Sequence, residues 1–330
     1  MYIYVIPYIL ILFVGVLTLF SKFSLNSARL IFLFFLLPVF FLVIFRGNIG
    51  VDTEVYESII DYYILTGECR VEPLFCFISE PIYSLVNRSD FTLRVITAIF
   101  CILFYFAFSK TKNDIVVASL FIFPVFFYDM STNGIRYGLA FILFKLLFDG
   151  LTKKSILTIP IYISIQSSSL LLVILSFINK INLKKIALIV LILAPIFYLL
   201  IGGTYLTQRI EAYSGNPSPN LYSGILNFLL GFLIISTLRY FRRILLKEFL
   251  IYFTILLSFQ ILSYFTYAGL RLVQLMLFYF AIRSIPLINI SNLKSNIIIC
   301  FILFITGFIY FLNLLRVMSV EHYLPYQFIF

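Results

Sequence analysis

The stretch "FFLVIFRGNIGVDTEVYESIIDYY", Phe40 to Tyr63, contains the boundary between a long apolar segment and a polar one. The apolar run stops at Arg46, and glycines, acids and tyrosines crowd the residues that follow. Gly47 and Gly50 free the backbone for a tight turn, and the pair Asp52-Thr53 is of the type that begins helices. The stretch predicts a membrane helix that ends in an arginine, then a turn and a second helix.

The composition places the whole chain in the membrane. Of its 330 residues, 62% are hydrophobic and 12% are charged, and the mean hydropathy is +1.09. Soluble domains carry about 25% charged residues, so we expect an all-α polytopic membrane protein, with residues 1–330 forming a single transmembrane domain. The first apolar run, Tyr2 to Phe20, has no small-residue cleavage site after it and is expected to be a retained span.

Apolar windows long enough to cross a bilayer predict about twelve membrane segments, counting two short ones. The longer windows are 2–20, 30–45, 91–109, 115–128, 137–149, 186–202, 222–238, 249–266, 272–285 and 296–314, and the short ones are 156–165 and 168–178. Residues 46–90 are expected to form an outer segment with interfacial helices, and residues 203–221 an outer loop.

Charge is distributed unequally between the alternating loops. One set of loops, with Lys145, holds sixteen basic residues and three acids, whereas the other set holds eight basic residues and eleven acids. The first set is therefore expected in the cytoplasm, and both termini outside.

The kind of basic residue also differs between the two sides. All eleven lysines fall on the inner side, and the eight outer positive charges are all arginine: Arg46, Arg70, Arg88, Arg94, Arg136, Arg209, Arg271 and Arg316. Arginine grips phosphate or carboxylate with a planar fork of donors. The set favours an oxyanion-binding outer cavity, although any single one of these arginines could equally anchor a helix end.

The segment from Ile156 to Ile178 has basic flanks and a polar centre, "QSSS", at Gln166 to Ser169. Two short helices bent at Gln166 would return both flanks to the cytoplasm, as a re-entrant pair. Each arm would be about 15 to 18 Å long, so the turn would lie inside the protein, lining a cavity. The alternative is one long tilted helix with serines on a packed face.

Further polar clusters lie on the expected outer side. "DMSTNGIRYGLA", Asp129 to Ala140, turns at Asn133 and continues through Arg136 into a span. "TYAGLRLVQ" contains Arg271 at the start of another span. The outer loop contains Arg209, Tyr213 and "SGNPSPN", and it is expected either to close over a ligand or to serve as a plain connector.

These motifs resemble the EpsG-like branch of the Wzy-type O-antigen and capsular polysaccharide polymerases. The resemblance rests on Arg46…Gly50-Val-Asp52-Thr53-x-x-Tyr56, then Glu72-Pro73-x-Phe75 and Ile135-Arg136, and it is loosest in the C-terminal third. The chain departs from that branch at Val51, at Tyr137 and at Gln166-Ser167-Ser168, where a His-x-Ser element is common. A histidine base at that last position is therefore impossible here.

The resemblance implies a membrane glycosyltransferase with a GT-C-like helical architecture in the bacterial inner membrane, with its active site facing the periplasm. It would join oligosaccharide repeat units carried on undecaprenyl diphosphate, as both donor and acceptor, into O-antigen or capsule polysaccharide. A polysaccharide chain-length regulator is a candidate partner, and nucleic acid is not expected.

Residue chemistry assigns candidate roles to the outer clusters. Departure of a diphosphate needs stabilised negative charge, which Arg46, Arg136 and Arg271 could supply without a metal or cofactor. Asp52 and Glu72 are candidate bases for the acceptor hydroxyl. The candidate substrate-binding residues are Thr53, Tyr56, Asn133, Tyr137, Gln166, Arg209, Tyr213 and Tyr267.

Two alternatives stay open for the function. A flippase for the same lipid-linked sugar would share the cationic cavity. An O-antigen ligase would share it too, although the only histidine, His322, lies near the terminus.

Cys69 and Cys76 are expected to be free thiols, because seven residues along a helix would separate them by about 10 Å.

Overall fold

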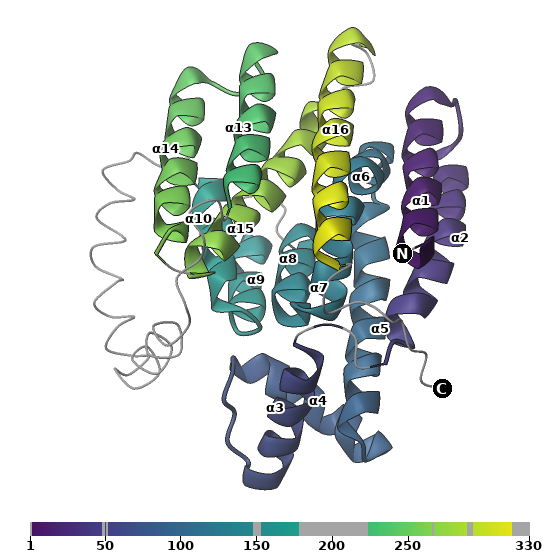
Figure 1. Cartoon of the computed structure of the whole chain (residues 1–330), viewed down its shortest axis with the longest axis vertical. Coiled ribbons are helices and arrows are strands. Elements are labelled where there is room, and N and C mark those ends of the chain that lie inside the picture. The colour runs from purple at the N-terminus through teal and green to yellow at the C-terminus, as the bar shows by residue number, and fades with distance from the viewer. Residues whose placement is uncertain are drawn as a thin grey trace. The chain divides into compact units, whose positions relative to one another are not determined.

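The structure, a computed structural model, describes residues 2–47, 50, 52–147, 153–177, 224–265, 267–288 and 293–318. Within these ranges the chain is helical and contains no β-strand (Figure 1). The predicted span 186–202 and the predicted outer loop 203–221, with Arg209 and Tyr213, lie outside the described residues.

The chain divides into two compact units, which are described separately. The first comprises Met1–Leu170 and Ala281–Phe330, and the second comprises Leu171–Phe280. The helices of the first unit are α1 Tyr2–Phe20, α2 Leu25–Ile44, α3 Thr53–Thr66, α4 Pro73–Val86, α5 Ser89–Phe108, α6 Lys112–Val117, η1 Ala118–Phe127, α7 Tyr128–Thr132, α8 Ile135–Leu147, α9 Lys153–Ile163, η2 Ser167–Ser169, η3 Ile285–Leu287 and α16 Leu293–Met318. The helices of the second are α10 Leu170–Phe177, α13 Ile225–Tyr240, α14 Leu246–Ser263 and most of α15 Tyr267–Ser284.

Among the residues that the structure describes, five helices are long and apolar enough to cross a membrane. They are Leu25–Ile44, Ser89–Phe108, Lys112–Thr132, Leu246–Ser263 and Asn296–Leu315. They agree with five of the predicted windows and support a membrane protein. The count of about twelve segments and the GT-C-like architecture stay predictions.

The helix from Lys112 to Thr132 forms the core of the first unit. Thr111 and Asp114 close its first turn with a reciprocal capping box. Every residue of its π-helical middle, η1, is buried, which explains why this helix is apolar on all sides. Pro124 within η1 has no N–H, so it cannot donate an α-helical hydrogen bond. The π-helical segment therefore lies where one α-helical bond is absent.

Glycines let two neighbouring helices approach this core closely. A Cβ added at Gly15 of α1 would lie 2.7 Å from Ser119 Cβ, and one at Gly307 of α16 would lie 2.3 Å from Leu120 O. Small residues at such contacts are the usual means by which membrane helices pack backbone against backbone.

Two lysines and two of the arginines that the sequence places outside lie at opposite ends of the helices of the first unit. Lys145 Nζ pairs with Asp114 at 2.8 Å, and Lys110 Nζ donates to Leu146 O at 2.8 Å. At the other end of these helices lie Arg46 and Arg136, beside α3 and α4. Arg29 lies at the lysine end, where it donates to Ser109 O and Lys110 O, and which end faces the cytoplasm stays a prediction.

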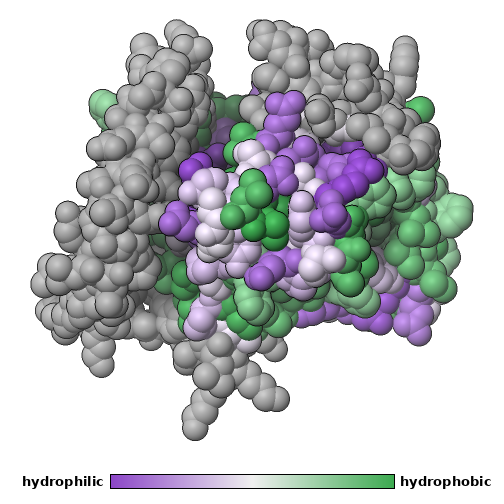
Figure 2. Space-filling view, turned by 90° about the horizontal axis from the view of Figure 1, so that it is seen from below, coloured by the Kyte–Doolittle hydropathy of each residue, from purple (hydrophilic) through white to green (hydrophobic). Residues whose placement is uncertain are grey.

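Hydrophilic residues gather on the face that α3 and α4 form (Figure 2). Large apolar side chains also lie on the surface of these two helices: Leu65 is 84% exposed, Phe77 69% and Leu85 86%. Interfacial helices carry such a mixture of polar and apolar exposure, and the interfacial placement of residues 46–90 stays a prediction.

The expected break at Gln166 is confirmed. Helix α9 ends at Ile163, Gln166 has an extended backbone with φ −153°, and η2 begins at Ser167. Gln166 N still donates to Tyr162 O at 3.1 Å, which closes the end of α9. The interpretation as one continuous helix is therefore wrong, whereas the side on which the two arms end stays a prediction.

The prediction of free thiols at Cys69 and Cys76 is wrong, because the two residues form a disulfide. The helical spacing behind that prediction does not apply, since α4 begins only at Pro73 and Cys69 lies in the turn before it. That turn brings the two Cα atoms to 6.1 Å, within bridging reach.

Buried hydroxyls and a close turn hold the second unit together. Tyr252 OH and Tyr279 OH lie 3.2 Å apart, and Tyr279 OH donates to Leu175 O at 3.0 Å. A Cβ added at Gly269 would lie 2.3 Å from Ser263 N, so only glycine fits where the start of α15 packs against the end of α14.

Candidate functional site

The turn between α2 and α3 is built against the loop that precedes α8. Gly50 has φ +103°, and a Cβ there would lie 2.7 Å from Asn133 Oδ1. Glycine is thus required both for its conformation and for its lack of a side chain. Asp52 stands at the N-cap of α3 without a side-chain capping bond, and the helix is closed by Tyr56 N donating to Asp52 O at 2.9 Å.

Arg46 is buried, with 5% of its surface exposed. Its guanidinium donates to the carbonyl of Ser131 and, at 3.4 Å, to that of Thr132. It therefore ties the end of α2 to the last turn of α7. A helix anchor that reaches out to water would not be buried in this way.

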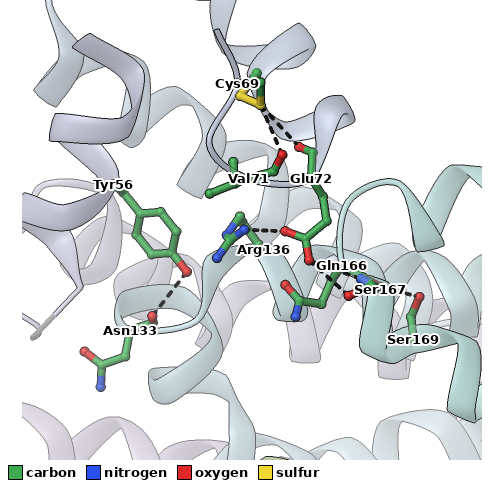
Figure 3. Close-up of polar contacts among 10 residues, drawn as sticks. Tyr56, Cys69, Val71, Glu72, Asn133, Arg136, Gln166, Ser167 and Ser169 are labelled. Atoms are coloured by element: carbon green, nitrogen blue, oxygen red, sulfur yellow. Dashed lines mark hydrogen bonds and ion pairs between the residues drawn. A yellow bond between two sulfur atoms is a disulfide. The ribbon is translucent and has the colours of Figure 1, made fainter. Parts of the chain in front are cut away.

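Arg136, in the first turn of α8, pairs with Glu72 at the N-cap of α4 (Figure 3). Arg136 Nη1 donates to Glu72 Oε2, while Glu72 Oε1 accepts from Ser167 N and Ser167 Oγ, each at 3.3 Å. Glu72 is 6% exposed. Buried charge is tolerated only when it is paired and hydrogen-bonded, and these three bonds meet that condition for the carboxylate.

Arg136 is not fully satisfied by this pairing. Its Nε is buried and has no hydrogen-bond partner among the residues that the structure describes. The centroid of the Tyr56 ring lies 5.7 Å from Arg136 Cζ, which is a cation–π contact. This contact supplies no hydrogen-bond acceptor for the Nε–H group. A buried donor left unpaired costs about 1 to 3 kcal/mol, which an arriving acceptor group would recover.

The tyrosines and Asn133 are fixed by the same loop. Tyr56 OH donates to Asn133 O at 3.3 Å, and Asn133 Nδ2 donates to Asp129 Oδ1 at 3.2 Å. Tyr137 OH donates to the other oxygen of Asp129. Asp129 thus holds two of the predicted substrate-binding residues, a role that the sequence pattern did not reveal.

The disulfide lies next to the ion pair. Cys69 and Cys76 bracket Glu72, and Leu74 N donates to Ser164 O at 3.1 Å. The start of α4 is therefore tied covalently to its own turn and by a hydrogen bond to the break after α9, so the position of Glu72 is fixed from two sides.

A second polar feature lies on the other side of α3. A small pocket is enclosed by the end of α2, by α3 and by α5. Its polar lining residues are Arg46, Thr53, Glu57, Asp90, Arg94 and Thr97. Glu57, Asp90 and Arg94 were not among the predicted site residues. The helical spacings Thr53-x-x-x-Glu57 and Asp90-x-x-x-Arg94, which place each pair on one helix face, were the available signal.

The structure brings together only part of the predicted site. Arg46, Thr53, Tyr56, Glu72, Asn133 and Arg136 lie around one end of the first unit, with Gln166 next to Ser167. Arg271 lies in the first turn of α15, in the second unit, where it is exposed. The Tyr267 side chain is outside the described residues. Within the described ranges, no group of three or more His, Cys, Asp or Glu side chains could hold a metal ion.

Comparison with known proteins gives one match. A model of the EpsG family matches residues 29–328, a range that includes the second unit, most of the first and all the site residues named above. No curated protein and no solved structure matches the chain.

Proposed function

Because the chain belongs to the EpsG family, we propose that it is a membrane polysaccharide polymerase. It joins oligosaccharide repeat units carried on undecaprenyl diphosphate into O-antigen or capsule polysaccharide. The reaction takes place at the periplasmic face of the bacterial inner membrane. The growing chain leaves its lipid diphosphate and passes to the non-reducing end of a new lipid-linked repeat.

The observation that carries this proposal is the state of Arg136. Glu72 fixes one side of its guanidinium, and its buried Nε has no acceptor among the described residues. A fixed cation with an unused donor, in a water-poor site, is suited to receive charge that develops during a reaction. The leaving diphosphate develops such charge when the bond to the anomeric carbon breaks.

The neighbouring residues take supporting roles in this proposal. Glu72, whose two oxygens are occupied by Arg136 and Ser167, positions the arginine. Arg46 holds the loop from which Asn133 and Arg136 project, and it also adds positive charge to the pocket wall. Tyr56 offers a ring face and a hydroxyl to a sugar.

The remaining predicted site residues enter as part of the same proposal. Arg209, Tyr213, Tyr267 and Arg271 are further candidates for contact with the lipid-linked substrates. A polysaccharide chain-length regulator is the candidate protein partner. A flippase or an O-antigen ligase would also use outer arginines, so the products decide among the three.

Lipid-linked glycans from cells that lack this protein test the proposal. If the protein is a polymerase, the polysaccharide ladder should collapse to a single repeat in these cells, and the wild-type gene should restore the ladder. Accumulation of repeats at the cytoplasmic face would instead identify a flippase. Accumulation of full-length polymer that is still linked to its lipid diphosphate would identify a ligase.

A further inference from the structure

The pocket between α2, α3 and α5 has a balanced set of charges. Arg46 and Arg94 are buried, at 5% and 8% exposure, and Glu57 and Asp90 supply two negative charges. Thr53 and Thr97 add hydroxyls. A pocket whose formal charges cancel does not select for a diphosphate, whereas carboxylate, guanidinium and hydroxyl groups together match the hydroxyl groups of a neutral sugar.

The two carboxylates of the pocket are held differently. Asp90 is bound by Arg88 at 3.0 and 2.8 Å and lies 3.6 Å from Arg94. Glu57 forms no hydrogen bond or ion pair with any residue in the described part of the chain, and it is half-buried. Of the pocket's acids, Glu57 is the one whose oxygens are available to a ligand.

Two parts of the structure, Arg46 and helix α3, connect the pocket with the Glu72–Arg136 pair. Arg46 lines the pocket and donates to the Ser131 carbonyl, five residues before Arg136. Along α3, Thr53 and Glu57 line the pocket, while Tyr56 faces the Arg136 guanidinium. A reaction between two lipid-linked sugars needs two adjoining subsites, and this arrangement provides them.

We propose that this pocket binds the acceptor sugar of the polymerase reaction and that Glu57 is the base that accepts the proton of its attacking hydroxyl. The inference rests on the proposed function. The hydroxyl oxygen forms a bond to the donor's anomeric carbon, while the bond from that carbon to the diphosphate oxygen breaks. The diphosphate leaves with the bonding electron pair, and the hydroxyl proton passes to a Glu57 oxygen.

The electrostatic surroundings suit that role. Burial, followed by Asp90, Asp61 and Glu54, raises the pKa of Glu57, and only Arg94 opposes them. A base works best when its pKa lies near the working pH. By comparison, Glu72 is occupied by Arg136 and Ser167, and Asp52 does not line the pocket.

The test measures initial rates of polymer formation by the full-length protein in liposomes across pH. The substrate is the lipid-linked repeat unit extracted from the source cells after deletion of the gene. Glu57→Gln should lower the rate by about 10² to 10⁴-fold, the usual contribution of a general base, and should remove the acid limb of the pH profile. Glu57→Asp should keep that limb at a lower rate.

A matched control and two contrary outcomes complete the design. Asp61→Asn removes a negative charge one turn away on α3, at an exposed position. It should keep the wild-type rate and move the acid limb slightly to lower pH, because Asp61 raises the pKa of Glu57. If wild type makes polymer and Glu57→Gln matches it in rate and pH profile, the inference is overturned while the polymerase assignment stands. If wild type makes no polymer, the proposed function itself fails.

Discussion

Arg46 and Arg136 carry the same charge in the same region but are held by different partners. Arg46 donates to two backbone carbonyls, whereas Arg136 is paired with a carboxylate and keeps an unused donor. The first arrangement supports the fold, and the second is suited to binding. Substitution by lysine separates the two roles, because lysine keeps the charge and loses the planar fork.

We expect Arg46→Lys to lower thermal stability. A single ammonium cannot bond both carbonyls from the same place, and a buried hydrogen bond to a charged group contributes about 1.5 to 3 kcal/mol. The chain has no Trp, but Cys101 and Cys300 are buried free thiols, so a thiol-reactive dye reports unfolding. Arg88→Lys, at a side chain that is 60% exposed, is the control and should leave Tm nearly unchanged. Equal Tm values for Arg46→Lys and wild type would contradict the structural role.

Glu57→Gln should make the protein more stable relative to wild type as pH rises from about 4 to 7. The folded-state pKa of Glu57 is raised by burial and neighbouring acids. Its favourable contribution is therefore complete below the unfolded-state pKa, about 4.3, and is lost as pH rises through the folded-state value. Glutamine does not titrate, so the Tm difference should grow in favour of the variant. A Tm that falls at pH 7 would instead indicate that the ionised Glu57 stabilises the fold.

At the scale of the element, Glu72 is positioned by the turn before α4 and by the start of α4 itself. The disulfide closes the turn before α4, and Pro73 occupies the first helical position, where its missing N–H costs nothing. The sequence motif Glu72-Pro73 predicted the start of this helix. It did not predict the disulfide, because the path of the chain between Cys69 and Pro73 is set by tertiary contacts such as Leu74 N to Ser164 O.

Replacement of both Cys69 and Cys76 by serine should reduce polymer formation while leaving the bundle folded. A disulfide that closes so short a loop contributes about 2 kcal/mol by chain entropy, here to the turn that fixes Glu72. The measurement is polymer yield with and without a membrane-impermeant reductant. Wild type should lose activity on reduction and the double variant should not respond. A reductant-insensitive wild type whose disulfide is shown to be reduced would argue against this role.

Gly307→Ala should destabilise the first unit through its core helix. The added Cβ would lie 2.3 Å from Leu120 O, a backbone atom that cannot move alone, and overpacking of this kind costs about 1 to 3 kcal/mol. Gly231→Ala on α13 is the control, because its nearest contact is a flexible Leu256 methyl at 3.2 Å and alanine favours a helix by about 1 kcal/mol. The thiol-dye Tm should fall for Gly307→Ala and hold or rise for Gly231→Ala.

At the scale of the whole molecule, hydropathy predicted the helices, whereas the partners of individual side chains could not be predicted. Apolar windows located the long apolar helices in the described ranges, and the polar centre at Gln166 located the break. The approach of Arg136 to Glu72 was not predictable, because it joins residues 64 positions apart through loop geometry. The pocket acids Glu57 and Asp90 were missed because acids near the start of a helix ordinarily serve as helix-dipole partners.

The topology around residues 154–184 is testable by labelling. Single cysteines placed at Lys154 and Lys184, in a background without accessible native thiols, should react with an impermeant reagent from the same side of the membrane. The expected side is the cytoplasm, because both flanks are basic. Reaction from opposite sides would show that the chain crosses the membrane between these positions and would overturn the re-entrant arrangement.

Turnover of purified protein in liposomes tests the central claim most directly, with wild type and Arg136→Lys supplied with the lipid-linked repeat unit. We expect wild type to lengthen the glycan and to release one lipid diphosphate for each repeat added. Arg136→Lys should fold normally and be slower by about a hundredfold or more, since one lost oxyanion donor costs about 3 to 4 kcal/mol. Polymer of normal length and rate from Arg136→Lys would contradict the claim that this arginine stabilises the leaving diphosphate.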